Sequence, residues 1–499
     1  MKKIIRSNQI YDSVKEPFKG FIQIEDGKIT NVQQGWDYEE FLDSNTELVI
    51  HDEEFIMYGI HDNHVFFTGY LSMNAGIDFS MISDFESALD LIRCEIGRLT
   101  DQTTPVYGHG WCRELVKMPT EDDLNHLNHF GPITVISQDR SYCSMNSQAK
   151  ERYGFTEEEC SAEDRVFLLK EMLSNKELVN QVYKKFENLL LSRGVVSIKE
   201  IIFDDCNYLN DLDSRTIRTN FYIQPVEKSL DFSLLKAYKE AKFPPKVKFG
   251  GSKLMVDGVV ASQTADVKGT YYSGTDKPMI DYPVISELVS RLSSAGIPCC
   301  LTAEGDKAIE ESATILSSNQ KINTVGYNSI SDLEMITNEA ARQMHEKEIV
   351  AEIYPQILGL NASIKEGYMD KVIVDQAGED FFNYKCLVDN NVLLTSGTDL
   401  PLFITDVPDS LVRANYRKFA KTNEQWFLDK GISTDDLLKS WTVNGYRANR
   451  LEEYGTIESG KNACLAVFNK NLCTASEAEL SDAEIVATYV DGECVYKKI

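Results

Sequence analysis

A chain of 499 residues has room for one large barrel with a smaller domain, or for three ordinary domains. Its formal net charge of −27 argues against nucleic acid and anionic membranes as partners, because both would repel the protein. The 11 cysteines form no C-x-x-C pair, which disfavours a disulfide framework or a structural zinc site and favours reduced thiols.

The first residues, "MKKIIRSNQIYDSVKEPF", lack the apolar run of about 7–15 residues that marks a signal peptide. No stretch approaches the ~18 apolar residues of a membrane span. Together with the reduced cysteines, these features predict a cytoplasmic protein that has no membrane partner.

Both ends of the chain predict β-hairpins. "FIQIEDGKITNVQQ" alternates around Asp26-Gly27, and "IVATYVDGECVYKK" alternates around Asp491-Gly492. Asp-Gly between alternating runs is a strong hairpin signal, because both residues tolerate positive φ. The segment "YGTIESGKNACLAVFNKNL" adds a further pair of strands. We therefore predict a composite β-sandwich domain built from residues 1–54 plus 442–499.

The middle of the chain predicts a different architecture, in which strands and helices alternate. Continuous apolar runs suit strands that are buried on both faces of a parallel sheet. With "FIMYGIHD" there are nine such runs, one more than an eight-stranded barrel needs; the others are 132–137, 194–201, 219–225, 252–258, 297–303, 322–328, 348–355 and 391–399. We predict an α/β fold, a (β/α)8 TIM-type barrel over residues 55–441, with a mostly helical insertion at 70–190 after the first barrel strand.

Catalytic groups of such a barrel lie at the carboxyl ends of its strands. Polar residues at these predicted ends are Asp62, His64, Asp139, Arg140, Lys199, Glu200, Lys253, Asp257, Thr302, Tyr327 and Asp399. Each of them alone is more simply a polar group that caps a loop. As a set at one end of one barrel, they indicate a pocket.

Several segments resemble the amidohydrolase superfamily, and within it the amidohydrolase family 3 group that includes N-substituted formamide deformylases. "FIMYGIHDNHVFF" is similar to the family's first barrel strand, L-P-G-F-I-D-x-H-x-H. "SKLMVDGVVASQTA" resembles V-K-x-x-x-D-G-S-x-x-S-x-T-A, "LTAEGDKAIEES" resembles H-A-x-G-D-x-A, and "SGTDLPL" resembles G-S-D-x-P. "VYGHGW", followed by "MPTEDDL", is similar to the family's G-x-G-W and L-P-T-x-x-D-L segments. The resemblance covers nearly the whole chain and implies the barrel fold.

The chain departs from the family at its metal ligands. The first ligand histidine is present as His64, and the second falls on Phe66. The histidines of D-G-H, of H-A-x-G-D and of the E-H motif fall on Ser141, Thr302 and Tyr327. A catalytic zinc takes three protein ligands, and phenylalanine and threonine cannot replace imidazole. The family implies a divalent metal such as zinc, but we expect no metal site here; His64, Lys253 and Asp399 are its residual ligand candidates.

The resemblance implies catalytic roles for Asp399 (proton shuttle), Lys253 (the family's metal-bridging lysine) and His64. Without a metal, Asp399 would act as a general base and a hydrogen-bonding cluster would stabilise the oxyanion. We expect Arg140, Tyr327, Thr302 and Asp257 to contact the substrate. The expected partner is a small molecule, and a homodimer is left open.

Two functions are compatible with these residues. The first is a hydrolase of a non-peptide carbon–nitrogen bond, or of a related activated ester or lactone, with a degenerate or metal-independent centre. The second is a catalytically inactive relative that binds a small molecule, in which Lys253 pairs with Asp399 because an unpaired buried charge is costly.

Overall fold

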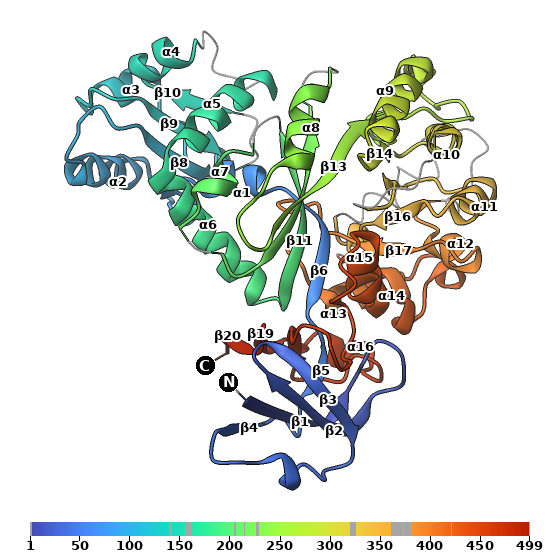
Figure 1. The fold of residues 1–499 in the computed structure, drawn as a ribbon. Coiled ribbons are helices and arrows are strands. Elements are labelled where there is room, and N and C mark those ends of the chain that lie inside the picture. Colours follow the sequence, from blue (N-terminus) through green and yellow to red (C-terminus); the bar gives the residue numbers. More distant parts are fainter. Residues whose placement is uncertain are drawn as a thin grey trace. The chain divides into compact units, whose positions relative to one another are not determined.

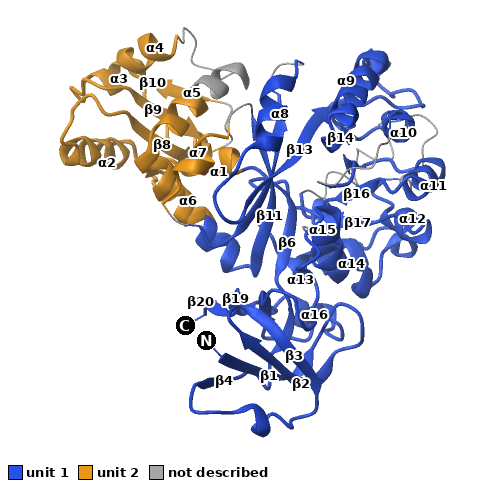
Figure 2. Ribbon diagram, viewed as in Figure 1, with its two compact units in different colours: residues 1–66, 187–205, 215–499 blue, residues 67–186, 206–214 orange. Residues whose placement is uncertain are grey.

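The protein is described by a computed structural model, which covers residues 2–138, 142–154, 162–203, 206–213, 215–225, 229–319, 326–360, 373, 381–420 and 422–498, with 162–167 as backbone only. The chain forms two compact units (Figure 2). The first comprises residues 1–66, 187–205 and 215–499, and the second comprises residues 67–186 and 206–214.

The first unit contains a nearly closed barrel of eight parallel strands, in the order β17-β16-β15-β14-β13-β12-β11-β6 (Figure 1). Most positions in these strands are buried, as expected for strands covered on both faces. Between the two ends of this order, the amide of Phe66 donates to the carbonyl of Leu400 at 2.8 Å. The predicted TIM-type barrel is confirmed. Its strands are β6 (Ile60–Val65), β11 (Val195–Phe203), β12 (Arg218–Gln224), β13 (Val247–Met255), β14 (Cys299–Ala303), β15 (Ser329–Asp332), β16 (Val350–Ile353) and β17 (Leu394–Ser396).

Two of the nine predicted barrel strands need correction. The run 132–137 forms β9 (Ile133–Ser137), which belongs to a separate sheet in the second unit. The run 322–328 precedes the strand that the barrel uses, because β15 begins at Ser329. Apolar runs identify buried strands, but they do not show which sheet a strand joins.

Helices of the first unit alternate with the barrel strands (Figure 1). Six of them begin at a side chain that accepts a backbone N–H, the usual N-cap arrangement: Asp231, Asp281, Thr337, Asn383, Asp406 and Ser433. These side chains satisfy backbone N–H groups that have no partner within the helix. The helices are α8 (Phe232–Glu240), α9 (Tyr282–Ser294), α10 (Asp306–Ser318), α11 (Asn338–Glu346), α12 (Tyr384–Asp389), α13 (Val407–Ser410), α14 (Thr434–Trp441) and α15 (Val443–Ala448).

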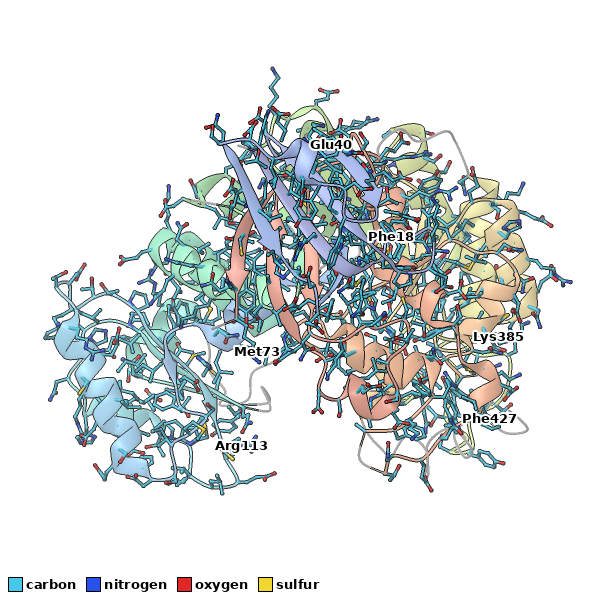
Figure 3. All side chains as sticks on the ribbon, turned by 90° about the horizontal axis from the view of Figure 1, so that it is seen from below. Phe18, Glu40, Met73, Arg113, Lys385 and Phe427 are labelled. Carbon is cyan, nitrogen blue, oxygen red and sulfur yellow. The ribbon has the colours of Figure 1, made fainter. Side chains whose placement is uncertain are left out.

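Strands from both ends of the chain form one further sheet in the first unit, in the order β20-β19-β18-β5-β1-β2-β3, with β4 paired to β1. Figure 3 views this sheet with Phe18, the first residue of β2, labelled. The bounds are β1 (Lys2–Ile10), β2 (Phe18–Glu25), β3 (Lys28–Gln34), β4 (Thr46–Ile50), β5 (Phe55–Tyr58), β18 (Leu465–Phe468), β19 (Ile485–Val490) and β20 (Glu493–Lys497).

Both predicted Asp-Gly hairpins are confirmed. The strands β2 and β3 pair antiparallel, as do β19 and β20. Asp26 and Gly27 have φ of 49° and 79°, and Asp491 and Gly492 have φ of 50° and 79°, so both turn residues use the left-handed region in each case. The bounds 1–54 plus 442–499 for a separate domain stay a prediction.

The second unit contains helices and a four-stranded sheet, in the order β10-β9-β8-β7. Its core includes Phe79 and Trp111, whose ring centroids lie 4.9 Å apart. The insertion predicted at 70–190 thus has a sheet in addition to its helices. Its elements are α1 (Phe67–Asn74), β7 (Ile77–Asp78), α2 (Phe85–Arg98), β8 (Val106–Trp111), α3 (Glu121–Asn125), β9, β10 (Cys143–Met145), α4 (Ser147–Tyr153), α5 (Ala162–Ser174), most of α6 (Lys176–Leu191) and α7 (Tyr208–Asp211).

None of the helices in the described ranges combines the length and the apolar character that a membrane crossing requires.

Gly397 allows the last barrel strand to approach the first. A Cβ atom at this position would lie 2.6 Å from the Cβ of His64 and 2.9 Å from its backbone nitrogen. Gly397→Ala is therefore expected to lower the free energy of unfolding by about 1–3 kcal/mol, the usual cost of overpacking. Thermal unfolding measures it. Gly359→Ala is the control, because its nearest contact would be 3.8 Å; equal effects of both changes would contradict the prediction.

Candidate active site

Asp62 connects the first barrel strand to the segment after the last one. Its carboxylate accepts the backbone N–H groups of His64 at 3.2 Å and of Thr398 at 3.1 Å. It also accepts the hydroxyls of Thr398 and Thr405, both at 2.7 Å. Burial raises the pKa of Asp62 to about 6, although the threonine hydrogen bonds oppose that shift. Asp62 therefore fixes the backbone around His64.

The three predicted catalytic residues lie together, because Lys253 and Asp399 both approach one ring nitrogen of His64. Its Nε2 lies 3.0 Å from Nζ of Lys253 and 3.8 Å from Oδ1 of Asp399. These side chains come from β6, from β13 and from the loop after β17. The His64 side chain is fully buried, whereas the side chain of Asp399 is 31% exposed. The site is thus a buried histidine and lysine beneath a carboxylate that faces solvent.

The protonation of His64 follows from its surroundings. Burial, together with the positive charge of Lys253, lowers the pKa of His64 to about 4. At neutral pH the ring is uncharged, so Nε2 accepts a hydrogen bond from the Lys253 ammonium. The other nitrogen, Nδ1, then carries the hydrogen and faces Oε2 of Glu352 at 3.4 Å.

Glu352 on β16 forms a buried ion pair with Lys199 on β11. Burial alone would raise the pKa of Glu352, but Lys199 and His64 outweigh it and hold the pKa well below its ordinary value. The ammonium of Lys199 also lies 4.1 Å from the centroid of the Tyr222 ring. A continuous polar series, Lys199–Glu352–His64–Lys253, therefore crosses the barrel interior.

Sequence reasoning missed Glu352. The available signal is a single acidic residue inside the apolar run "EIVAEIYP", at a position that a parallel strand buries. Lys199 is recognisable as a strand-end residue, but its partner lies 153 positions away in the sequence.

Phe66, at the position of the family's second ligand histidine, packs against the site. Its ring centroid lies 5.5 Å from that of His64 and 5.5 Å from that of Phe203, with which it stacks. Nζ of Lys253 lies 5.6 Å from the centroid of the same ring. The stacked rings of Phe66 and Phe203 thus lie beside His64, on the side where the family's second ligand histidine is expected.

Thr302 lies at the carboxyl end of β14 and joins the polar surface of the site. Its hydroxyl lies 3.1 Å from that of Ser331, and Ser331 donates to Asp332 at 2.7 Å. Its predicted contact with substrate stays a prediction. Asp257 has a structural role, because its carboxylate accepts the backbone N–H groups of Glu304, Gly305 and Asp266 at 3.0, 3.0 and 2.9 Å.

Tyr327 does not reach this site. It precedes β15, so it lies at the opposite end of the barrel from Asp399. There its amide donates to the carbonyl of Ala448, and its ring lies 3.9 Å from the guanidinium of Arg450. The residue at the carboxyl end of β15 is Asp332. The match of Tyr327 to the family's E-H motif depends on a strand that ends at residue 328, whereas β15 begins only at Ser329.

Arg140 and Ser141 lie outside the described residues. The predicted role of Arg140 in substrate binding stays a prediction. The ion pair between Lys253 and Asp399 also stays a prediction, because both groups approach Nε2 of His64 without a direct pair between them being described.

Four carboxyl groups lie at or just after the carboxyl ends of neighbouring barrel strands, and we call them the mouth acids: Asp257, Glu304, Asp332 and Glu334. Burial raises the pKa of Glu304 to about 11, and the charges of Glu334 and Asp332 add to this shift. Burial also raises the pKa of Asp257, to about 6; the charge of Asp332 adds to this shift, and the backbone hydrogen bonds to the carboxylate oppose it. This end of the barrel thus gathers several carboxyl groups, of which Glu304 is protonated and uncharged at neutral pH.

Glu304→Gln is expected to stabilise the protein increasingly as pH rises. Between its ordinary pKa of 4.5 and about 11, folding binds a proton at Glu304, so stability falls with rising pH across this window. Glutamine removes that dependence. The increase in the free energy of unfolding that the substitution brings should therefore grow by about 1.4 kcal/mol per pH unit between pH 6 and 8. Urea unfolding at several pH values measures it. Glu287→Gln, an exposed site, is the control; a gain independent of pH would contradict the prediction.

The residues around His64 do not fit a zinc ion. Among the described residues, no group of three or more His, Cys, Asp or Glu side chains could hold a metal. Nε2 of His64 already accepts the Lys253 ammonium, and Nδ1 faces Glu352. A metal on Nε2 would meet an ammonium 3.0 Å from that nitrogen, so the donor set suits a cationic lysine instead.

Enzymes built on a parallel eight-stranded barrel hold their catalytic side chains at the carboxyl ends of the strands. The ionisable side chains described above lie at the same end.

Comparison with known proteins gives the family. The model of the amidohydrolase family matches residues 59–496, and the chain therefore belongs to that family. A protein named as amidohydrolase YtcJ, from Bacillus subtilis (strain 168), is 21% identical over 543 aligned residues that span 100% of both chains. The N-substituted formamide deformylase of Arthrobacter pascens is 32% identical over 71 residues, which are 14% of this chain and 13% of that protein. The resemblance inferred from the motifs is confirmed.

The crystal structure of an uncharacterized metal-dependent hydrolase from Pyrococcus horikoshii OT3 has the same fold, with a TM-score of 0.75, at 16% identity and with 96% and 99% of the two chains covered. At this identity the likeness establishes the fold alone. Family membership supports hydrolase activity, and the chemistry must be argued from the residues of this chain.

Proposed function

We propose that the protein is a hydrolase that cleaves a non-peptide carbon–nitrogen bond of a small molecule without a metal ion. The observation that supports this most is the position of the Lys253 ammonium. It lies 3.0 Å from Nε2 of His64, and His64 stands at the position of the family's first metal-ligand histidine. A fixed positive charge is therefore available where the carbonyl oxygen of a substrate becomes negative.

In the proposed reaction, Asp399 removes a proton from a water molecule and the resulting hydroxide attacks the carbonyl carbon. Lys253 donates a hydrogen bond to the oxygen that becomes an oxyanion. As the carbon–nitrogen bond breaks, Asp399 returns its proton to the leaving amine, so acid and amine form from amide and water. General base catalysis contributes about 10²–10⁴-fold, and one oxyanion donor about 10²–10³-fold.

His64 and Glu352 act as positioning residues in this proposal. Neutral His64 accepts one hydrogen of the Lys253 ammonium and so directs the remaining hydrogens. Glu352 faces the other ring nitrogen and thereby selects the tautomer. Lys199 balances the charge of Glu352, so the whole series keeps Lys253 in one orientation.

Hydrolysis of a panel of small amides, N-substituted formamides, cyclic amides and lactones tests the proposal. The protein is first dialysed against a chelator. We expect turnover of at least one class to persist in the chelator and to be lost in Lys253→Met. Turnover that returns only with added zinc or manganese would overturn the metal-free assignment.

The second candidate is an inactive relative that binds a small molecule. The packing of Phe66 and Tyr354 against His64 favours it, because the ring centroids lie 5.5 and 5.4 Å from that of His64 and narrow the space beside it. Binding of panel compounds without turnover, equal in wild type and Asp399→Asn, would select this function.

A further inference from the structure

The barrel mouth contains more carboxyl groups than the proposed reaction uses. Asp399 is its general base, whereas the mouth acids have no part in the bond cleavage. Asp332 lies close enough to His64 and to Asp257 for its charge to affect both. Its side chain is only partly buried, and its carboxylate accepts a hydrogen bond from the hydroxyl of Ser331 at 2.7 Å.

These carboxyl groups are not arranged as a metal site. Over the part of the chain that the structure describes, no three of them converge closely enough to ligate one ion. Carboxylates that do not converge on one point still attract a larger organic cation, because the attraction between charges does not require ligation geometry.

A second and independent feature lies beside them. Tyr354 is 5% exposed, and its hydroxyl has no hydrogen-bond partner among the described residues. Its ring stands edge-on to His64, with centroids 5.4 Å apart. The charges of Asp332 and Asp399 both act on this hydroxyl. Buried polar groups usually have a partner, so this hydroxyl is available to pair with a polar ligand atom.

Among the described residues, the two lysines nearest to His64 do not cancel these charges. Lys199 is paired with Glu352, and Lys253 is directed to His64. The net charge of −27 would add to the effect, because it steers positively charged molecules toward the protein.

We propose that the substrate carries a cationic nitrogen group, an ammonium or an amidinium, that is held by Asp332 and the hydroxyl of Tyr354. The position of the scissile bond beside Lys253 and Asp399 rests on the proposed function. Recognition of the cation does not, since it requires only Asp332 and Tyr354.

Binding of three molecules of nearly equal shape tests this inference: benzamidinium, neutral benzamide and anionic benzoate. Calorimetric titration of wild type should show benzamidinium binding about 10–100-fold more tightly than benzamide, the value of a charged hydrogen bond. Benzoate should bind more weakly than both.

The variants Asp332→Asn and Tyr354→Phe should each reduce this preference about tenfold or more, with the melting temperature confirming that they fold. Glu287→Gln removes the same charge at an exposed position and should keep the preference. Equal affinity for benzamidinium and benzamide, or a preference unchanged in both site variants, would overturn the inference. Because these assays measure binding, a cation preference without any turnover would refute only the proposed hydrolysis.

Discussion

Asp399→Asn is expected to lower kcat by about 10²–10⁴-fold, since it removes the general base while keeping the shape of the side chain. The loss should appear in kcat more than in KM, because the proton transfer belongs to the reaction step. Steady-state kinetics on whichever panel compound is hydrolysed measures both constants.

Asp389→Asn is a matched control for this change, because Asp389 is an exposed carboxylate on α12 that pairs with Lys385. Its kcat should equal that of wild type. An Asp399→Asn protein that keeps more than about a tenth of the wild-type kcat would contradict the role of Asp399 as base.

Lys199→Met is expected to lower the free energy of unfolding by about 3–5 kcal/mol, because it leaves Glu352 as an uncompensated charge in the barrel interior. The side chains of this pair are only 2% and 3% exposed. Chemical denaturation monitored by fluorescence measures the change.

A double variant separates the cost of an unpaired charge from the loss of packing. Lys199→Met combined with Glu352→Leu removes both charges and should recover most of the stability. Lys385→Met breaks an exposed pair on α12 (Figure 3) and should cost less than about 1 kcal/mol. If Lys199→Met lowered the free energy of unfolding no more than Lys385→Met, the buried ion pair would not stabilise the barrel more than an exposed pair does.

Most of the fold could be predicted from the sequence because its strands are apolar and its hairpins have Asp-Gly turns. The strand β15 shows where apolar patterning fails. It has the sequence "SISD", and its two serines are buried. Ser331 is satisfied by Thr302 and Asp332, contacts that cannot be known before the barrel is assembled.

The candidate site could be predicted in part. Family motifs point to His64, Lys253 and Asp399, and the structure brings all three to one nitrogen. Glu352, Tyr354 and Asp332 escape prediction as site residues, because their significance comes from neighbours on other strands. A single sequence does not show that Lys199 and Glu352 meet, or that the hydroxyl of Tyr354 is left without a partner among the described residues.

Metal content tests the central claim, that the protein works without a metal because the ammonium of Lys253 approaches Nε2 of His64. The protein would be expressed with added zinc and manganese, purified without chelator and measured by mass spectrometry. We predict much less than one equivalent of either metal, because the ammonium of Lys253 occupies Nε2 of His64. One or more tightly bound equivalents, lost together with activity in His64→Ala, would contradict the claim.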